Sequence, residues 1–251
     1  MTAPAPFASV VMPAVTEVRS LIEAVDTIFA VAGEHLRRVF IVVCEKTTKD
    51  CLAAGDQLSE RYPSRVVVVP QRLPLLGGAL REGLAAAEGS HVVVMYSDGE
   101  SDPSTIAPLL AEARRSPEAI VSASRWLRGS VFEGYPPGKT LLNWLFQKLF
   151  AALYGTSVTD FTFGYRVYPL ALVRAIAWEE VGHAFVFESI VKPLRLGVAV
   201  RELPTVWKTR AEGQSQLRPW MYLRYFLVGV RTRLGRADRF LNAGAGNLRG
   251  I

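Results

Sequence analysis

The 251-residue chain is half hydrophobic and 21% charged, which excludes a disordered protein and suffices for one sizeable core. Its net charge of +6 favours an anionic partner, but its basic residues form no lysine-rich run and RNA-type aromatic motifs are missing, so we expect no nucleic acid. Two cysteines and three scattered histidines exclude a disulfide scaffold and a histidine metal site, and they indicate a reduced, cytoplasmic compartment. We expect neither a signal peptide nor a membrane-spanning helix.

Strands and helices alternate through the first half of the chain. Apolar runs predict strands at residues 8–13, 39–44, 65–69, 92–96 and 119–123, and helices are predicted at 15–31, 49–62, 80–87 and 103–115. Continuous apolar strands separated by helices indicate an α/β fold whose mostly parallel central sheet carries helices on both faces. Ligands bind at the carboxyl ends of such strands, so residues 13–17, 44–48 and 98–100 should line one crevice.

An acidic turn follows the fourth predicted strand. Asp98 and Glu100 lie within the turn, where closely spaced carboxylates can hold a divalent cation against a diphosphate. Asp102 precedes Pro103 and is expected to cap the next helix. The turn therefore suggests an enzyme that acts on nucleotides.

The pattern changes after Ser124. A loop at 128–139 leads to an amphipathic stretch at 141–154, whose apolar side chains would pack on the sheet or contact a bilayer while Gln147 and Lys148 face water. Residues 220–234 mix large apolar side chains with arginines, which favours an interfacial helix on anionic lipid. These two segments predict peripheral membrane contact.

Several short motifs follow one another in a fixed order between residues 10 and 217. The first half contains 10–17 (VVMPAVTE), 42–47 (VVCEKT), 76–84 (LGGALREGL) and 96–100 (YSDGE). The second half contains 123–125 (ASR), 160–166 (DFTFGYR), 187–188 (FE), 202–204 (ELP) and 210–215 (RAEGQS). Together they resemble the motifs of family 2 glycosyltransferases, in particular the dolichol-phosphate mannose synthase type. In this alignment Tyr96 replaces the first acid of the metal motif D-x-D-x-Q, and Glu100 replaces its glutamine.

The resemblance implies a GT-A fold and a set of site residues. It places a glycosyltransferase domain at 1–217, with a nucleotide-sugar half at about 1–125 and an acceptor half at about 126–217, and an amphipathic, basic segment at 218–251. By resemblance, the metal ligands for Mg²⁺ or Mn²⁺ are Asp98 and Glu100. The implied nucleotide-sugar contacts are Pro13, Ala14, Glu17, Glu45, Gly77, Ser97 and Asp98. Arg125, Lys139 and Arg210 would hold the acceptor phosphate and, with Asp98, are the catalytic candidates.

The implied reaction is the inverting, metal-dependent transfer of a sugar from GDP-mannose or a UDP-sugar to a polyprenyl phosphate, at the cytoplasmic face of the membrane. A lipid phosphate is already ionised near neutral pH, so it needs no general base, and the planar fork of arginine suits it. Two alternatives remain open. One is a non-catalytic nucleotide-binding relative that lost acids at Tyr96 and Cys44. The other is a transferase for a sugar or small hydroxyl acceptor, with Asp160 or Glu188 as general base. Arg166 is expected to pair with Asp160 and stabilise a turn.

Overall fold

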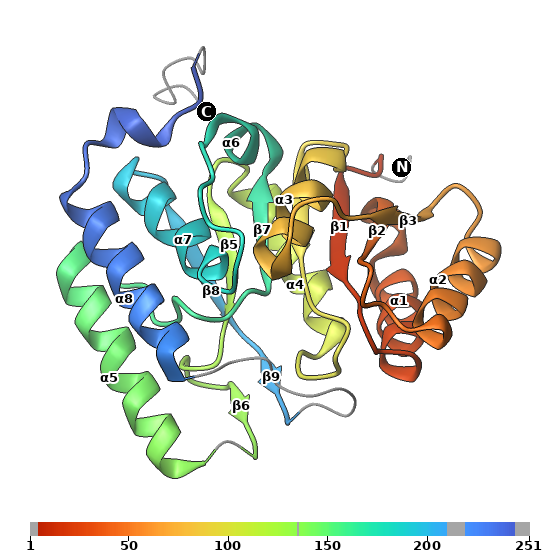
Figure 1. Cartoon of the computed structure of the whole chain (residues 1–251), viewed down its shortest axis with the longest axis horizontal. Helices are drawn as coiled ribbons and strands as arrows, with labels where there is room; N and C mark the ends of the chain where they lie inside the picture. The colour runs from red at the N-terminus through yellow and green to blue at the C-terminus, as the bar shows by residue number, and fades with distance from the viewer. Residues whose placement is uncertain (1–4, 135, 210–218, 244–251) are drawn as a thin grey trace.

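A computed structural model describes residues 5–134, 136–209 and 219–243. Within these residues, a seven-stranded central sheet has the order β3-β2-β1-β4-β7-β5-β8 (Figure 1). Its strands are β1 (Ala8–Pro13), β2 (Leu36–Val43), β3 (Val66–Pro70), β4 (His91–Val94), β5 (Ile120–Ser124), β7 (Arg166–Pro169) and β8 (Val200–Pro204). Neighbouring strands are parallel except where β7 pairs with β4 and β5. The predicted mostly parallel sheet is therefore confirmed.

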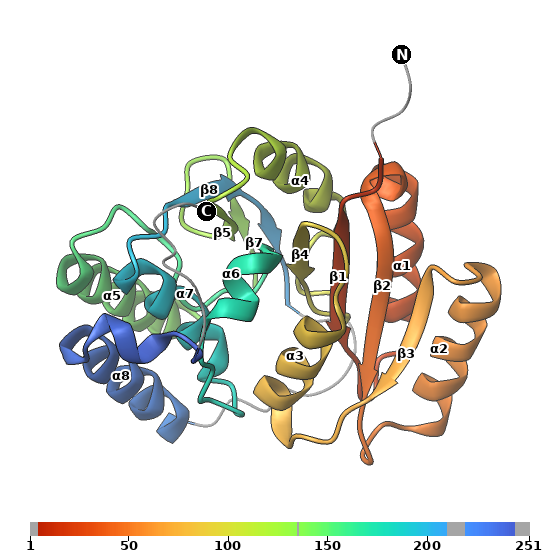
Figure 2. The ribbon, with the colours of Figure 1, turned by 90° about the horizontal axis from the view of Figure 1, so that it is seen from above.

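Helices cover both faces of this sheet, as predicted (Figure 2). On one face lie α1 (Arg19–Ala32), α2 (Lys49–Arg61) and α4 (Ile106–Arg115), and on the other lie α3 (Leu75–Ala86), α6 (Leu170–Ala175) and α7 (Phe185–Arg195). Successive side chains of β1 alternate between the two layers: Val10 and Met12 pack in the α1 layer, whereas Val11 packs in the α3 layer. Because both faces of β1 and β4 are covered, these two central strands are buried and mainly apolar.

Strand β7 departs most from the predicted pattern. It lies antiparallel between β4 and β5, with Val93 opposite Val167, so both predicted halves of the chain contribute to one sheet. Element boundaries also shift. The first helix begins at Arg19 rather than residue 15, and β4 ends at Val94 because the following residues form the acidic turn. Short 3₁₀ helices span η1 (Gly33–His35), η2 (Pro103–Thr105) and η3 (Ala237–Phe240).

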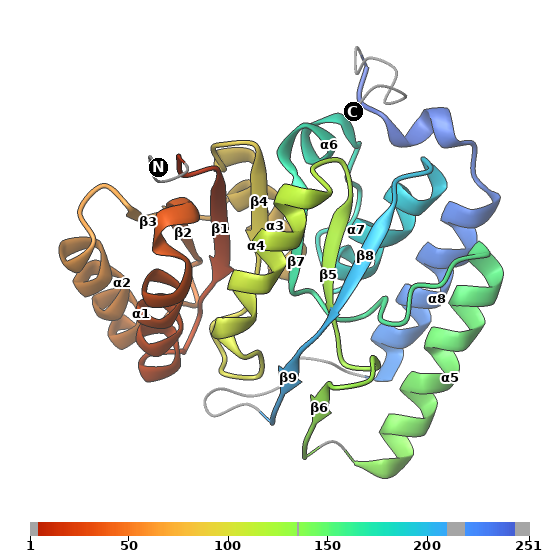
Figure 3. The same cartoon turned by 180° about the vertical axis from the view of Figure 1, so that it is seen from behind.

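Two long helices form a further layer outside α7. These are α5 (Pro137–Tyr154) and α8 (Pro219–Leu234), which lie side by side (Figures 1 and 3). Aromatic rings join the three helices: the centroid of Phe187 lies 4.8 Å from that of Phe150 on α5 and 5.8 Å from that of Tyr225 on α8. A small parallel pair, β6 (Val131–Phe132) with β9 (Val206–Trp207), lies beyond the end of the central sheet.

The orientation of α5 differs from the prediction at Gln147 and agrees with it at Lys148. Gln147 is buried, with 2% of its surface exposed, so the expectation that it faces water is wrong; Lys148 is exposed. Gln147 turns inward because it forms hydrogen bonds with residues 161 and 162, which leaves large apolar side chains outside. Leu234, which ends α8, is also exposed, but we call the other nine large exposed apolar residues of the two helices the outer apolar surface. They are Leu141, Leu142, Trp144, Leu145 and Leu149 on α5, and Tyr222, Leu223, Phe226 and Leu227 on α8.

The arginines of α8 were expected to suit anionic lipid, but they have partners within the chain. Arg224 forms two hydrogen bonds with the carboxylate of Glu180, at 3.0 and 2.6 Å, and Arg231 pairs with Glu179 at 2.5 Å. Arg233 donates to the carbonyl oxygen of Leu153. These contacts fasten α8 to the rest of the protein. In the described part of the chain, no helix combines the length and hydrophobicity needed to span a membrane.

His91, at the start of β4, predicts a pH dependence of stability. Burial lowers the pKa of its imidazole, although a hydrogen bond with the Pro117 carbonyl oxygen at 3.1 Å opposes this. The unfolded chain, with a histidine pKa near about 6.5, therefore takes up a proton before the folded chain does. We expect the free energy of unfolding in urea to fall between about pH 7.5 and about pH 5.5, and to fall less in His91→Gln. An equal fall in both proteins would contradict this assignment.

Candidate active site

A cavity of about 210 Å³ opens at the carboxyl ends of β1, β4 and β5. Its walls come from these strand ends, the start of α3, the turn before β7, the start of α7, β9 and α8. The lining residues are Pro13, Val15, Glu17, Leu76, Tyr96, Ser97, Asp98, Glu100, Arg125, Thr162, Phe163, Gly164, His183, Val186, Trp207 and Tyr225. The segments 13–17 and 98–100 thus meet in one crevice as expected, whereas 44–48 does not line it.

The turn after β1 is held by its own polar side chains. One carboxylate oxygen of Glu17 accepts from the backbone N–H groups of Val15 at 2.7 Å and Thr16 at 2.9 Å. The hydroxyl of Ser97 donates to the carbonyl oxygen of Pro13 at 2.8 Å, which ties the ends of β1 and β4 together. These bonds place Pro13, Glu17 and Ser97 at one wall of the cavity.

Three other residues that were predicted to contact the nucleotide sugar do not line the cavity. Ala14 is buried and its backbone N–H donates to the Val42 carbonyl oxygen, while Glu45 is exposed after β2. Gly77 is buried where α3 meets the segment before α7, and a Cβ there would lie 2.6 Å from the carbonyl carbon of Val181. Close packing therefore explains this glycine without a nucleotide. Nucleotide contact by these residues stays a prediction.

The acidic turn is ordered by backbone bonds and by strand β9. One carboxylate oxygen of Asp98 accepts from the Glu100 N–H at 3.1 Å. The indole N–H of Trp207 donates to the Glu100 carboxylate at 3.3 Å, and the Lys208 N–H donates to the Glu100 carbonyl oxygen at 3.0 Å. Asp102 accepts from the Ser104 N–H at 2.9 Å and caps η2, as predicted. The sequence carried no signal for the contribution of Trp207, because β9 is only two residues long.

The acids of this turn fit a divalent cation that binds together with a diphosphate. The described residues contain no group of three or more histidine, cysteine, aspartate or glutamate side chains arranged for a metal ion. Two carboxylates, Asp98 and Glu100, nevertheless line one cavity, and Mg²⁺ is commonly held by one or two carboxylates with phosphate oxygens and water. The donor set is therefore sufficient only when the substrate supplies further ligands.

Tyr96, which stands where the resemblance would place the first acid of the metal motif, packs under the turn that precedes β7. A Cβ at Gly164 would lie 2.3 Å from the Tyr96 hydroxyl oxygen, so the glycine makes room for the phenol. Burial raises the pKa of Tyr96 well above its usual value, with a smaller contribution from Tyr225. The side chain is a neutral phenol at physiological pH and supplies no negative charge.

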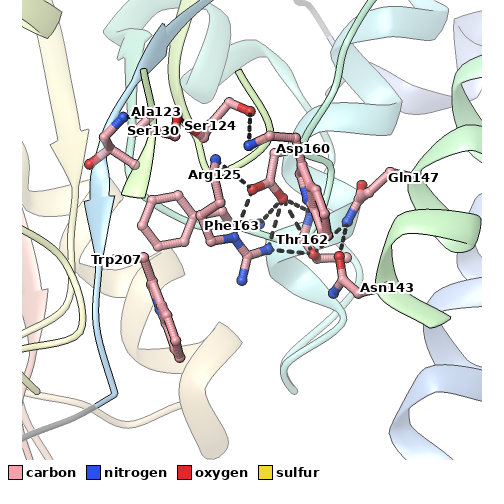
Figure 4. Close-up of polar contacts among 12 residues, drawn as sticks. Ala123, Ser124, Arg125, Ser130, Asn143, Gln147, Asp160, Thr162, Phe163 and Trp207 are labelled. Atoms are coloured by element: carbon pink, nitrogen blue, oxygen red, sulfur yellow. Dashed lines mark hydrogen bonds and ion pairs between the residues drawn. The ribbon is translucent and has the colours of Figure 1, made fainter. Parts of the chain in front are cut away.

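A buried ion pair joins the end of β5 to the turn at 160–163. Asp160 is fully buried, and its carboxylate accepts from Nε of Arg125 at 2.8 Å and from its NH2 at 2.9 Å (Figure 4). The same carboxylate accepts from the backbone N–H of Phe163 at 3.1 Å. The Arg125 guanidinium lies 5.2 Å from the ring centroid of Phe132 and 5.0 Å from that of Phe163. These contacts fix a guanidinium plane at the cavity wall.

Arg166 contacts Asp160 and stabilises the turn as predicted, but it binds the backbone carbonyl oxygen of Asp160 and not the carboxylate. Arg166 is fully buried and donates to the carbonyl oxygens of Val186 at 2.7 Å, Phe161 at 2.9 Å and Asp160 at 3.2 Å. Its side chain lies on the α7 side of β7, whereas the Asp160 carboxylate faces Arg125. Both arginines stabilise the same turn, one through the carboxylate and the other through backbone oxygens.

The two candidate general bases are enclosed by donors. Glu188 is buried and accepts from the N–H groups of Glu179 and Glu180 and from Nζ of Lys192 at 2.6 Å. Asp160 is bound as described above, and neither residue lines the cavity. A general base must reach the proton that it removes, so this arrangement does not favour a hydroxyl acceptor activated by either residue.

Lys139 and Arg210 are the two other residues that were predicted to hold the acceptor phosphate. Lys139 is exposed on the first turn of α5 and does not line the cavity, and Arg210 lies outside the described residues. His183, two residues before α7, and Tyr225, on α8, line the cavity, and neither was predicted to do so. The apolar and arginine-rich pattern of 220–234 indicated a surface helix but not that one of its tyrosines would reach the cavity.

This fold and site define the class: an α/β protein of the GT-A type, with an acidic turn at the carboxyl edge of its sheet. The chain belongs to glycosyl transferase family 2, whose model matches residues 9–176. It is therefore a glycosyltransferase.

Individual relatives are distant. The chain is 30% identical over 148 residues to an undecaprenyl-phosphate mannosyltransferase of Micrococcus luteus, covering 57% of this chain and 60% of that protein's length. It is 25% identical over 248 residues to a dolichol-phosphate mannosyltransferase of Pyrococcus furiosus, covering 97% and 69%. A solved structure of glucosyl-3-phosphoglycerate synthase from Mycobacterium tuberculosis, in complex with Mn²⁺, UDP and phosphoglyceric acid, superposes with a TM-score of 0.64. It is 22% identical and covers 92% of this chain and 79% of that one, which shows the shared fold.

Asp160→Asn tests the importance of the buried pair. The substitution keeps the shape but leaves the Arg125 guanidinium, whose side chain is 8% exposed, without its counter-charge. We expect the free energy of unfolding in urea to fall by about 3–5 kcal/mol. The exposed pair Arg236–Asp238 provides the control, because water screens it and Asp238→Asn should leave the free energy of unfolding nearly unchanged. Equal effects of the two substitutions would show that the buried pair has no special role.

Proposed function

We propose that the protein transfers a sugar from a nucleotide-diphosphate donor, GDP-mannose or a UDP-sugar, to a polyprenyl phosphate at the cytoplasmic face of a membrane. The observation that carries this proposal is the meeting of the Asp98–Glu100 turn and Arg125 in one cavity. The names of the Micrococcus and Pyrococcus relatives support a polyprenyl-type phosphate as acceptor.

The residues of the cavity have separate tasks in this reaction. The turns at 13–17 and 96–100 hold the donor at the carboxyl edge of the sheet. Asp98 and Glu100 would hold Mg²⁺ or Mn²⁺, which neutralises the charge that develops on the departing diphosphate. Arg125 binds the acceptor phosphate and aims one of its oxygens at the anomeric carbon, with Lys139 and Arg210 as further candidates.

Proton transfer is not required of the protein. A phosphate monoester is ionised near neutral pH, and its oxygen attacks the anomeric carbon as the bond to the diphosphate breaks on the opposite face. This matches a cavity in which Asp160 binds Arg125 instead of facing the acceptor. Among the acceptors considered, a phosphate therefore fits better than a hydroxyl compound.

Membrane contact is the second part of the proposal. The outer apolar surface of α5 and α8 presents nine large apolar side chains, and Tyr225 of α8 also lines the cavity. An apolar helix face placed on a bilayer would bring the cavity near the lipid phosphate. Arg224 and Arg231 of α8 form ion pairs with Glu180 and Glu179, so the proposed attraction rests on the burial of apolar side chains.

The proposed reaction is tested by incubating the protein with Mn²⁺, a short polyprenyl phosphate and a panel of labelled nucleotide sugars. We expect lipid-extractable label with one donor, loss of label with EDTA, and a fall of about 100-fold or more in Asp98→Asn. Asp102→Asn is the matched control, because this neighbouring acid caps η2 outside the cavity lining. Nucleotide binding without transfer to lipid would favour the non-catalytic alternative.

Vesicle binding tests the membrane contact. The double substitution Leu145→Glu with Leu149→Glu places charges on the outer apolar surface, and we expect about tenfold or greater weakening of co-sedimentation with phospholipid vesicles. Val31→Glu changes an exposed apolar residue of α1, outside that surface, and should leave binding unchanged. Unaltered vesicle binding by the double variant would contradict membrane contact through α5.

A further inference from the structure

The inward side of α5 forms a chain of hydrogen bonds that ends at Arg125 (Figure 4). The side-chain nitrogen of Gln147 donates to Oδ1 of Asn143 at 2.7 Å and to Oγ1 of Thr162 at 2.9 Å. Its side-chain oxygen accepts from the Phe161 backbone N–H at 2.8 Å. Both amide hydrogens and the amide oxygen are therefore engaged, which fixes the orientation of the side chain.

Thr162 connects the side chain of Gln147 to the guanidinium of Arg125. Its hydroxyl oxygen accepts from Gln147 and, at 2.9 Å, from NH2 of Arg125, and it donates to Oδ1 of Asp160 at 3.4 Å. A hydroxyl has one hydrogen and two lone pairs, so these three bonds use its full capacity. The NH2 group of Arg125 is shared between Asp160 and Thr162, so displacement of the hydroxyl alters the direction of the guanidinium.

Because these side chains are buried, breaking the series of hydrogen bonds costs free energy. Gln147 is 2% exposed and Asn143 is 8% exposed, so water does not readily replace a lost partner at either amide. The linked residues come from separate parts of the sequence: Gln147 lies 15 residues before Thr162, and Thr162 lies 37 residues after Arg125. The geometry of Arg125 therefore depends on how α5 packs.

We propose that Gln147 is a positioning residue for sugar transfer, which orients Arg125 through the hydroxyl of Thr162. The inference rests on the proposed function, in which Arg125 binds the acceptor phosphate. In this arrangement α5 supports Arg125 with its inward face and carries the proposed membrane contact on its outer face.

Three variants isolate the role of this amide. Gln147→Met keeps an unbranched side chain of similar length but removes every hydrogen bond. Gln147→Glu still accepts from the Phe161 N–H but, when ionised, cannot donate to Thr162. Lys148→Met is the matched control, since it introduces the same side chain at the next, exposed position of α5. Thr162→Val removes the link from its other end and serves if a Gln147 variant fails to fold.

Two readouts separate positioning from plain stability. The first is kcat and KM for the labelled donor and a short polyprenyl phosphate in detergent. We expect kcat to fall about 10- to 100-fold in both Gln147 variants, because Arg125 is misplaced. We expect the KM for the nucleotide sugar to stay within about twofold, because the turns at 13–17 and 96–100 are unchanged. The second is the ¹H–¹⁵N NMR signal of the Arg125 Nε–H, assigned by its disappearance in Arg125→Lys. We expect this signal to shift in both Gln147 variants and in Thr162→Val, and to stay in place in Lys148→Met.

The outcomes distinguish this inference from the proposed reaction. An Arg125 Nε–H signal that is unchanged in the Gln147 variants overturns the positioning role, whether or not the enzyme is active. Equal losses of kcat in Gln147→Met and Lys148→Met also overturn it, since the effect would then belong to α5 in general. A wild-type protein that transfers no sugar to any lipid phosphate overturns the proposed reaction, and in that case a shifted signal supports only the structural link between Gln147 and Arg125.

Discussion

The buried pair of Arg125 and Asp160 is the interaction on which the cavity depends. Removing two charges from water costs several kcal/mol for each ion, so such a pair persists only where further hydrogen bonds complete it. Here the carboxylate also accepts from the backbone of the 160–163 turn, and aromatic rings flank the guanidinium. The pair closes β5 onto the segment that enters β7, and it thereby shapes one wall of the cavity.

Three separate elements support the same turn. Glu202 of β8 accepts from the N–H groups of Thr159 at 2.7 Å and Asp160 at 3.0 Å, and burial raises the pKa of its carboxyl group. Arg166 of β7 holds the turn through its carbonyl oxygens, and Gln147 of α5 holds it through Phe161 and Thr162. Because each support comes from a different part of the chain, the cavity forms only when sheet and helices have assembled.

The same packing produces the outer apolar surface. An amphipathic helix on a soluble protein usually buries its apolar stripe, but α5 buries Asn143 and Gln147 and exposes Trp144, Leu145 and Leu149. The Gln147 amide is satisfied by the turn and by the Asn143 side-chain oxygen, so its burial leaves none of its polar atoms unpaired. The helix thus combines an ordered polar interior with an apolar exterior, and the second property accounts for the proposed membrane contact.

The sequence by itself determined the layered α/β fold, the family and the acidic turn. Apolar runs and helical spacing report burial along a single element, and they located β1 to β5 and the adjoining helices to within a few residues; ordered motifs identified the family. Only the tertiary structure decided that β7 runs antiparallel inside the sheet, that the Asp160 carboxylate binds Arg125 while Arg166 binds backbone oxygens, and that Gln147 faces inward. It also brought Trp207 against Glu100, 107 residues away. The physical reason is that periodicity constrains local burial, whereas the partner of a buried polar group depends on which distant segments meet when the chain closes.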